Sequence, residues 1–355
     1  MKIKVKDKLY PKDNNDYYPC LKWLISKRLV FFIVLVIGIL SIFLCQNSVT
    51  YPYNSILLRF FSGDVRIKAK SGYVAYEGEV KKGKAEGEGT LYGKSGNRIY
   101  TGAFKNSMYN GEGTLFYENG QIQYKGEFKE NEFYGIGELY RENGSIEYKG
   151  GFYKGKKEGE GRLYNNTNHL IFAGNFLGNQ VYYEELLGKS TEEIASMYSG
   201  AYMIYKDKDN VVVALEEISA LYQGSQEASL ENGWKVGEIY VCKDWISIGR
   251  EEYFKIEELK KVLGNPVYEG NTYLTMAEAV CLEYTNRAGI TILKPAIIKK
   301  EPLYQEVVQV AGLETDYMVY LYTYEYGGLF YSFYCQSRDG EFAMYQIEKA
   351  EVKRE

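Results

Sequence analysis

Two patterns of apolar and polar residues divide the chain. Residues 29–45 form one continuous apolar run, LVFFIVLVIGILSIFLC, without a charged side chain. From about residue 63 the pattern changes to short alternating runs separated by glycine-rich turns. Alternation predicts β-strands, because successive side chains of a strand point to opposite faces. The sequence therefore predicts one helix followed by a mainly β fold.

The apolar run predicts a transmembrane signal anchor. Its seventeen residues lie at the short end of what crosses the hydrocarbon core of a bilayer. No small-residue cleavage site follows it, which favours retention over removal as a signal peptide. Residues 1–28 carry eight Lys or Arg and three Asp. This bias predicts a single-pass protein with a cytoplasmic N-terminus and an extracytoplasmic remainder. A buried core helix is the alternative.

A five-residue motif returns every 24 residues. Tyr76–Val80 recurs as Tyr100–Phe104, Tyr124–Phe128, Tyr148–Phe152 and Phe172–Phe176. Eleven residues after each of the first four aromatic starts comes a second motif, G-x-G-x-L-[YF], or a close variant of it. The aromatic and glycine positions of this signature are Tyr76, Gly78, Gly87, Gly89, Tyr100, Gly102, Gly111, Gly113, Tyr124, Gly126, Gly135, Gly137, Tyr148, Gly150, Gly159 and Gly161.

The two motifs predict the paired strands of a β-hairpin. Tyr76 and Gly78 share one face of a strand, so aromatic rings can lie across bare glycine backbone on the next strand. Asn119-Gly120 and Asn143-Gly144 are typical of tight turns. One hairpin cannot bury its own apolar face, so we expect the units to stack into an antiparallel ribbon over residues 63–180.

The pattern Y-x-G-x-[FV]…G-x-G-x-L-[YF] resembles the MORN (membrane occupation and recognition nexus) repeat. The resemblance covers about a third of the chain. It implies a twisted antiparallel ribbon used for protein contacts, self-association or phospholipid contact. Because such arrays are also attached to enzymes, the resemblance names no reaction.

Two sets of side chains in the array are candidates for binding. Tyr92, Phe116, Tyr140 and Tyr164 have opposite parity to the inward leucines and predict an aromatic stripe for a protein partner. The alternative is that this stripe packs against the C-terminal domain or the twisted sheet.

The second set is a recurring row of lysines, Lys81, Lys105 and Lys129. These ammonium groups predict contact with anionic lipid or an envelope polymer. The alternative is a solvated sheet edge that blocks aggregation, because the array carries 17 basic against 15 acidic residues.

Residues 181–355 have no 24-residue period and predict an acidic α+β domain with an antiparallel meander. Ser190 and Glu193 form a capping box ahead of a helix near residues 192–198. A second helix is expected at Ile256–Leu263, ending at Gly264. The clearest strand-like runs are residues 317–324, 329–335 and 342–347.

The chain offers no convincing catalytic, cofactor-binding or metal-binding set. Gly188-Lys189-Ser190 lacks the earlier glycine of a phosphate loop, because Tyr183 stands there. His169 is the single histidine and lies in a repeat connection. A multi-histidine metal site would need further histidines, and a catalytic triad would need its histidine beside a nucleophile and a carboxylate. An enzyme in the C-terminal domain, using carboxylate pairs such as Glu216/Glu217 or Glu251/Glu252, remains an alternative.

The three cysteines beyond the apolar run, Cys242, Cys281 and Cys335, are interpreted as buried thiols. One disulfide with an odd thiol is the alternative. The part of the chain after the apolar run is acidic, with 35 basic and 44 acidic residues, which argues against a nucleic-acid partner.

The sequence thus predicts a mainly β protein with an N-terminal transmembrane helix, an antiparallel β-hairpin ribbon and a C-terminal α+β domain. We expect no enzyme and no cofactor. The expected function is a membrane-anchored scaffold that binds a protein partner or its own copy, and the alternative is contact with anionic lipid or an envelope polymer through the repeat lysines. The predicted segments are a basic tail 1–28, an anchor 29–45, a linker 46–62, an array 63–180 and a domain 181–355.

Overall fold

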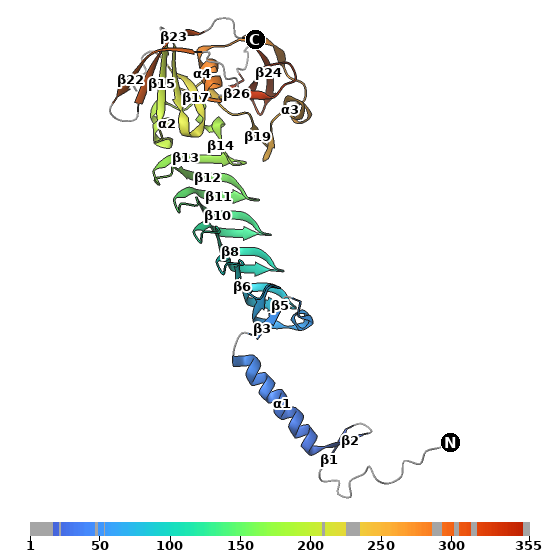
Figure 1. Ribbon diagram of the computed structural model, residues 1–355. Helices are drawn as coiled ribbons and strands as arrows, with labels where there is room; N and C mark the ends of the chain where they lie inside the picture. The colour runs from blue at the N-terminus through green and yellow to red at the C-terminus, as the bar shows by residue number, and fades with distance from the viewer. Residues whose placement is uncertain are drawn as a thin grey trace. The chain divides into compact units, whose positions relative to one another are not determined.

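The computed structural model describes residues 17–20, 23–46, 49–52, 54–207, 210–224, 235–285, 293–301, 305–313 and 318–350 (Figure 1). It divides into two compact units, Met1–Ser107 and Met108–Glu355. Most of the predicted basic tail lies outside the described residues. The segment boundaries expected from the sequence stay predictions.

The first unit contains one helix and the first repeat hairpins. Strands β3 to β7 form a sheet in chain order, in which β3 pairs parallel to β4 and the other neighbours pair antiparallel. Its elements are β1 (Tyr17–Cys20), β2 (Trp23–Ser26), α1 (Lys27–Gln46), β3 (Val49–Pro52), the 3-10 helix η2 (Ile56–Phe60), β4 (Ser62–Lys68), β5 (Val74–Lys81), β6 (Lys84–Tyr92) and β7 (Arg98–Lys105).

The expected transmembrane anchor at residues 29–45 is wrong. A helix does form there, but within the described residues no helix is long and apolar enough to cross a membrane. The apolar run within α1 holds seventeen residues, fewer than the about 20 apolar residues that a bilayer typically requires. The single-pass localisation built on this anchor, with a cytoplasmic N-terminus and an extracytoplasmic remainder, is wrong with it.

The second unit continues the hairpins, each strand pairing antiparallel with the next. The predicted antiparallel β-hairpin ribbon is therefore confirmed. Its strands are β8 (Met108–Phe116), β9 (Ile122–Lys129), β10 (Glu132–Tyr140), β11 (Ile146–Tyr153), β12 (Lys156–Tyr164), β13 (Leu170–Leu177) and β14 (Gln180–Val181).

Each hairpin bends over its own aromatic residue. Between β9 and β10 the register passes from Tyr134 opposite Glu127 to Gly137 opposite Gly126, so β10 has two extra residues at a bulge. One of them, Gly135, has a φ of 60°, which glycine adopts without strain. The bend places the ring of Phe133 flat on the ring of Tyr124, with centroids 3.9 Å apart and planes 7° apart.

The tyrosine ring lies on bare glycine backbone, as the sequence predicts. The ring of Tyr124 is fully buried and meets Phe128 and Phe152 edge-on at 5.0 and 5.1 Å. A Cβ at Gly137 would overlap the Tyr124 hydroxyl, so glycine is required at this close approach. The hydroxyl donates to the carbonyl oxygen of Glu127 at 3.0 Å.

The same bond to the carbonyl three residues on recurs in the other complete repeats. Its donors are Tyr76, Tyr100 and Tyr148, at 2.7, 2.9 and 3.2 Å from Glu79, Ala103 and Gly151. Each repeat therefore satisfies a backbone acceptor from within its own aromatic core.

The C-terminal part of the second unit is a ten-stranded sheet with helices, in the order β21-β24-β25-β26-β18-β17-β16-β15-β23-β22. The described pairs are antiparallel except β15 with β23. Its sheet strands are β15 (Tyr202–Asp207), β16 (Asn210–Leu215), β17 (Ala220–Gly224), β18 (Glu238–Val241), β21 (Tyr268–Tyr273), β22 (Leu293–Glu301), β23 (Gln305–Leu313), β24 (Met318–Tyr326), β25 (Leu329–Cys335) and β26 (Phe342–Lys349). The remaining elements are η3 (Tyr183–Leu186), α2 (Thr191–Met197), η4 (Glu216–Ile218), the hairpin β19 (Ile246–Ile248) and β20 (Glu251–Tyr253), α3 (Ile256–Leu263) and α4 (Met276–Thr285).

The expected helices near residues 192–198 and 256–263 are confirmed as α2 and α3, and the capping box of Ser190 and Glu193 is present. Helix α4 was not expected. It covers the sheet and buries Ala279, Val280 and Cys281 against residues such as Leu221 and Met344.

We predict that Gly137→Ala lowers the free energy of unfolding by about 1–3 kcal/mol, the usual cost of forcing a methyl group into a packed site. Urea unfolding followed by tyrosine fluorescence measures this change. The matched control is Gly237→Ala in the same unit, where a Cβ meets nothing within 4 Å. Equal stability of the two variants would contradict the glycine requirement.

Candidate binding surface on the repeat array

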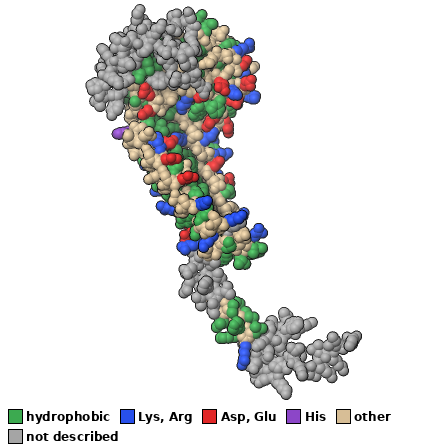
Figure 2. All heavy atoms as spheres, in the orientation of Figure 1, with side chains coloured by type: hydrophobic (Ala, Val, Ile, Leu, Met, Phe, Trp, Pro, Cys, Tyr) green, Lys and Arg blue, Asp and Glu red, His purple; other side chains and the backbone are tan. Residues whose placement is uncertain are grey.

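The repeat sheet has an outer face, defined as the face opposite the tyrosine core. Leu139 is paired with the buried Tyr148 on the core side, so its chain neighbours Glu138 and Tyr140 point to the outer face. Figure 2 shows that Lys, Arg, Asp and Glu side chains are mixed along the repeats. The strand register resolves this mixture into rows that cross the strands.

One row of the outer face is cationic. The register places Lys125 opposite Glu138, Glu138 opposite Lys149, and Lys149 opposite Arg162. The Glu138 carboxylate accepts from the Lys149 ammonium at 2.8 Å, and this bond holds the pKa of Glu138 below its usual range. Three cations therefore share one carboxylate, and the row keeps a positive charge at neutral pH.

Within the second unit, Phe116, Tyr140 and Tyr164 of the predicted aromatic stripe lie beside this row, and Tyr92 belongs to the first unit. Tyr92, Phe116, Tyr140 and Tyr164 are all half-buried. The Tyr140 hydroxyl donates to the Glu138 carboxylate, and burial together with this bond raises the pKa of Tyr140 to about 12. Tyr140 therefore stays neutral and fixed near the charged row.

Aliphatic side chains widen the stripe in the second unit. Phe116 pairs with Ile122, Tyr140 with Ile146, and Tyr164 with Leu170. Tyr92 holds the equivalent place in the first unit and pairs with Arg98. In the second unit the stripe is thus an apolar row, two residues from the cationic row along β10 and β12 and three along β9 and β11.

Bonds between successive turns hold the backbone of the apolar row in place. The Tyr117 hydroxyl donates to the carbonyl oxygen of Tyr140 at 2.7 Å. One repeat later the Arg141 guanidinium donates to the carbonyl oxygens of Tyr164 and Ile146, both at 2.6 Å. The row is therefore preorganised before any partner arrives.

The predicted lysine row lies at the other end of the strands. Lys81, Lys105 and Lys129 are exposed and lie next to the tight turns. Lys129 lies seven steps along β9 from Ile122, which places this lysine roughly 23 Å from the apolar row. The Lys129 ammonium lies 4.9 Å above the Tyr134 ring. The structure therefore does not bring the lysine row and the aromatic stripe together.

In the fourth repeat Tyr153 takes the lysine position and meets a cation from the turn between β19 and β20. The guanidinium of Arg250 lies 4.4 Å above the Tyr153 ring and donates to the Glu158 carboxylate at 2.8 Å. Lys156 donates to the Arg250 carbonyl at 3.1 Å and pairs with Glu252 at 3.3 Å. The hairpin β19–β20 thus binds the array near the tight turn between β11 and β12.

The remaining sequence candidates lie apart from the outer rows. His169 sits at the surface in the turn between β12 and β13, with its Nδ1 2.8 Å from the Thr167 hydroxyl (Figure 2). Cys281 and Cys335 are buried free thiols and Cys242 is half-buried. Among the residues that the structure describes, no group of His, Cys, Asp or Glu is placed to hold a metal ion.

Sequence reasoning missed the cations beside the stripe. Lys125 and Lys149 are 24 residues apart and occupy the variable position of Tyr-x-Gly, and Arg162 occupies a variable position of G-x-G-x-L. Reading the variable positions in register, together with strand pairing, would have placed them in one row.

A half-buried lysine just after β18 of the C-terminal sheet predicts a pH dependence. The Lys243 ammonium lies 5.0 Å from the Trp245 ring and 5.6 Å from the Tyr183 ring. Burial, and then the charge of Lys157, lower the pKa of Lys243 to about 8. Below pH 8 both the folded and the unfolded chain carry this charge. From about pH 8 the folded chain releases a proton that the unfolded chain still holds, so stability rises with pH.

Relative to Lys243→Met, the wild-type chain should gain about 1 kcal/mol of unfolding free energy between pH 7 and pH 9. Urea unfolding of both proteins at each pH measures the gain, and the comparison cancels the contribution of the buried tyrosines. Lys261→Met, which removes an exposed lysine, should behave like the wild type. Parallel pH profiles for wild type and Lys243→Met would contradict the burial of this charge.

Comparison with known proteins bears on the repeats alone. A search of the curated proteins found no match to this chain. The family model described as MORN repeat matches four segments, residues 76–98, 100–122, 124–146 and 148–168. The sequence resemblance, the hairpin register and the family match agree, and the chain therefore contains four MORN repeats within residues 76–168.

Proposed function

We propose that the protein is a binding scaffold that holds a partner protein on the outer face of its MORN array. The repeats indicate a binding or scaffold role in general. The observation that carries the finer proposal is the pair of parallel rows on the outer face, one apolar and one cationic. No reaction is assigned to the chain.

The two rows define the kind of segment that would fit. Apolar side chains of the partner contact Phe116, Tyr140 and Tyr164, and carboxylates of the partner meet Lys125, Lys149 and Arg162. Aromatic anchors supply most of the affinity of such interfaces, and charge complementarity sets partner choice and association rate. The proposed partner therefore presents an acidic, amphipathic surface.

A second proposal is contact with anionic lipid or an anionic polymer through Lys81, Lys105 and Lys129. Their exposure supports it. Against it, the row ends at Tyr153, where Arg250 of the same chain takes the place of a ligand. We therefore rank lipid contact below partner binding.

Replacing Phe116, Tyr140 and Tyr164 together by Ser should abolish capture of the partner. These side chains are half-buried on the outer face and lie outside the tyrosine core, so far-UV circular dichroism should stay close to the wild type. Affinity capture with the full chain, quantified by mass spectrometry, measures the loss. Undiminished capture by a folded variant would rule out the apolar row as the binding surface.

Charge variants separate the two proposals. Lys125→Gln, Lys149→Gln and Arg162→Gln together remove the outer cations, and Lys81→Gln, Lys105→Gln and Lys129→Gln remove an equal charge at the other end of the strands. We expect the first triple variant to lose at least about tenfold in partner affinity, the effect of about 1.4 kcal/mol, and the second to keep it.

The reverse outcome would overturn the partner proposal. If the second triple variant loses binding to vesicles containing phosphatidylserine at low salt while both triple variants capture the same proteins, the lysine row is the functional surface. If both triple variants keep every interaction, both proposals fail.

A further inference from the structure

At one end of the C-terminal sheet, strand β21 has an edge that no other described strand pairs with. Strand β21 is the first strand of the ten-stranded order, and in the described part of the chain it pairs with β24 only. Its six residues pair from Tyr268 opposite Thr323 to Tyr273 opposite Met318, without a register shift. A regular edge of this length presents backbone N–H and C=O groups that another strand can pair with.

The two edge strands of this sheet differ in composition. At the other edge, β22 contains Pro295 and three lysines within Leu293–Glu301. Proline and lysine are the residues by which proteins keep edge strands from pairing. Strand β21, with the sequence YEGNTY, contains neither. The absence of these residues is therefore specific to one edge.

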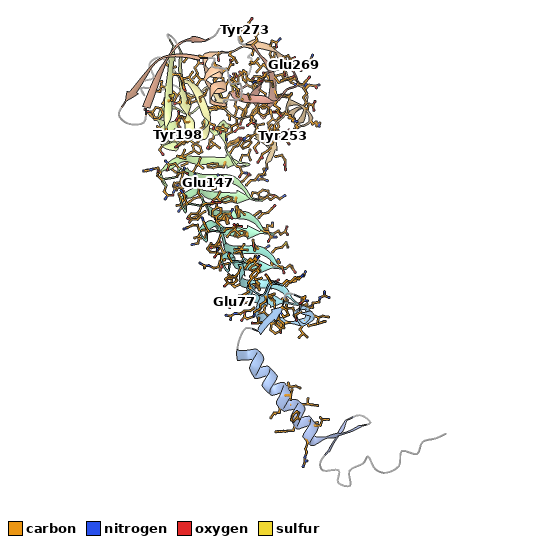
Figure 3. All side chains as sticks on the ribbon, in the orientation of Figure 1. Glu77, Glu147, Tyr198, Tyr253, Glu269 and Tyr273 are labelled. Atoms are coloured by element: carbon orange, nitrogen blue, oxygen red, sulfur yellow. The ribbon has the colours of Figure 1, made fainter. Side chains whose placement is uncertain are left out.

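The side chains around β21 are exposed and mostly apolar. The exposed fractions are 58% for Val267, 49% for Tyr268, 63% for Tyr273 and 51% for Met318. Figure 3 labels Tyr273 and Glu269 in this part of the domain. Glu269 is the one charged residue of the strand, and it pairs with Arg338 at 3.2 Å. The edge thus carries little uncompensated charge to repel an incoming strand.

Symmetry decides which registers a second copy could use. A two-fold axis normal to the sheet keeps the faces of both strands on the same side, so opposed residues must differ by an even number in sequence. With Gly270 on the axis, Glu269 opposes Asn271 of the second copy. With Asn271 on the axis, Glu269 opposes Tyr273 of the second copy. Neither register opposes two like charges, which would be destabilising.

We propose that the protein forms a two-fold dimer by antiparallel pairing of β21 with β21 of a second copy, joining two C-terminal sheets into one. This inference goes beyond the proposed function, because it uses a surface of the C-terminal domain and leaves the outer face of each array available. A dimer would present two arrays to one partner and raise the apparent affinity through avidity.

The first test is the mass of the full chain in solution, by light scattering over a dilution series. The wild type should be a dimer that dissociates on dilution. Tyr268→Lys combined with Tyr273→Lys should raise the dissociation constant by at least about tenfold, because lysine on an edge strand disfavours pairing. The matched control is Phe254→Lys with Tyr326→Lys, which changes residues of 45% and 47% exposure outside β21.

The second test fixes the register. Directly opposed residues of antiparallel strands have Cα atoms about 4.5–5.5 Å apart, within disulfide reach. Gly270→Cys and Asn271→Cys, each oxidised with diamide, should give a covalent dimer in the variant whose new cysteine lies on the axis. The wild type, with Cys281 and Cys335 buried, is the background control.

Three outcomes would overturn the proposal. The first is a monomeric wild type at its highest soluble concentration. The second is a dimer that survives the two lysine substitutions in β21. The third is a dimer that is lost when Phe116, Tyr140 and Tyr164 are replaced by Ser but kept when Tyr268 and Tyr273 are replaced by Lys. That result would place self-association on the array. Partner capture by a monomeric chain would leave the proposed function standing while this inference fails.

Discussion

The repeat array depends on one contact, a tyrosine ring resting on glycine backbone with its hydroxyl bonded to the carbonyl three residues on. Tyr124 shows why the contact requires this pair of residue types. A side chain at Gly137 would overlap the ring, and a phenylalanine at Tyr124 would leave the Glu127 carbonyl without the hydroxyl. Edge-on aromatic pairs contribute about 0.5–1.5 kcal/mol each and a buried hydrogen bond about 1 kcal/mol. No single repeat is strongly stabilised, and the array is stable because each ring also packs on the next repeat.

Because the tyrosine and glycine core stabilises the array, the side chains on the outer face are available for binding. The core positions of the repeats hold Tyr, Phe or Val, Leu and Gly, whereas the alternate positions of the same strands face outward and vary. At these positions Lys125, Lys149 and Arg162 lie in one row. Strand pairing places residues of equivalent repeat positions opposite one another on strands about 4.8 Å apart. The same outward-facing position in successive repeats therefore forms one extended surface.

The sequence predicted the hairpin ribbon, its turns and the ring-on-glycine contact, because all three follow from short-range spacing. It also predicted α2 and α3, since Ser190 with Glu193 and Gly264 are local signals. The transmembrane anchor was wrong, because a charge-free run of seventeen residues is too short a guide on its own. Helix α4 was missed although Thr275 and Glu278 bond to each other's backbone amides as a capping box does, because its apolar residues lack a clear helical period. The cationic row depends on register between strands, which no single segment of sequence encodes.

The segment that leads from the array to the C-terminal sheet repeats the tyrosine and glycine contact once more. Phe172 ends the aromatic series without a hydroxyl, and Tyr198 pairs with it through an isolated bridge. The Tyr198 hydroxyl donates to the carbonyl of Ala201, again three residues on, and a Cβ at Gly200 would lie 2.7 Å from that hydroxyl. The chain has therefore reused the tyrosine and glycine arrangement to join the array to the following sheet. Because Arg250 fastens the hairpin β19–β20 to Tyr153 and Glu158 as well, the junction is held on two sides. A partner bound near Tyr164 would therefore be held in a fixed position relative to the C-terminal sheet.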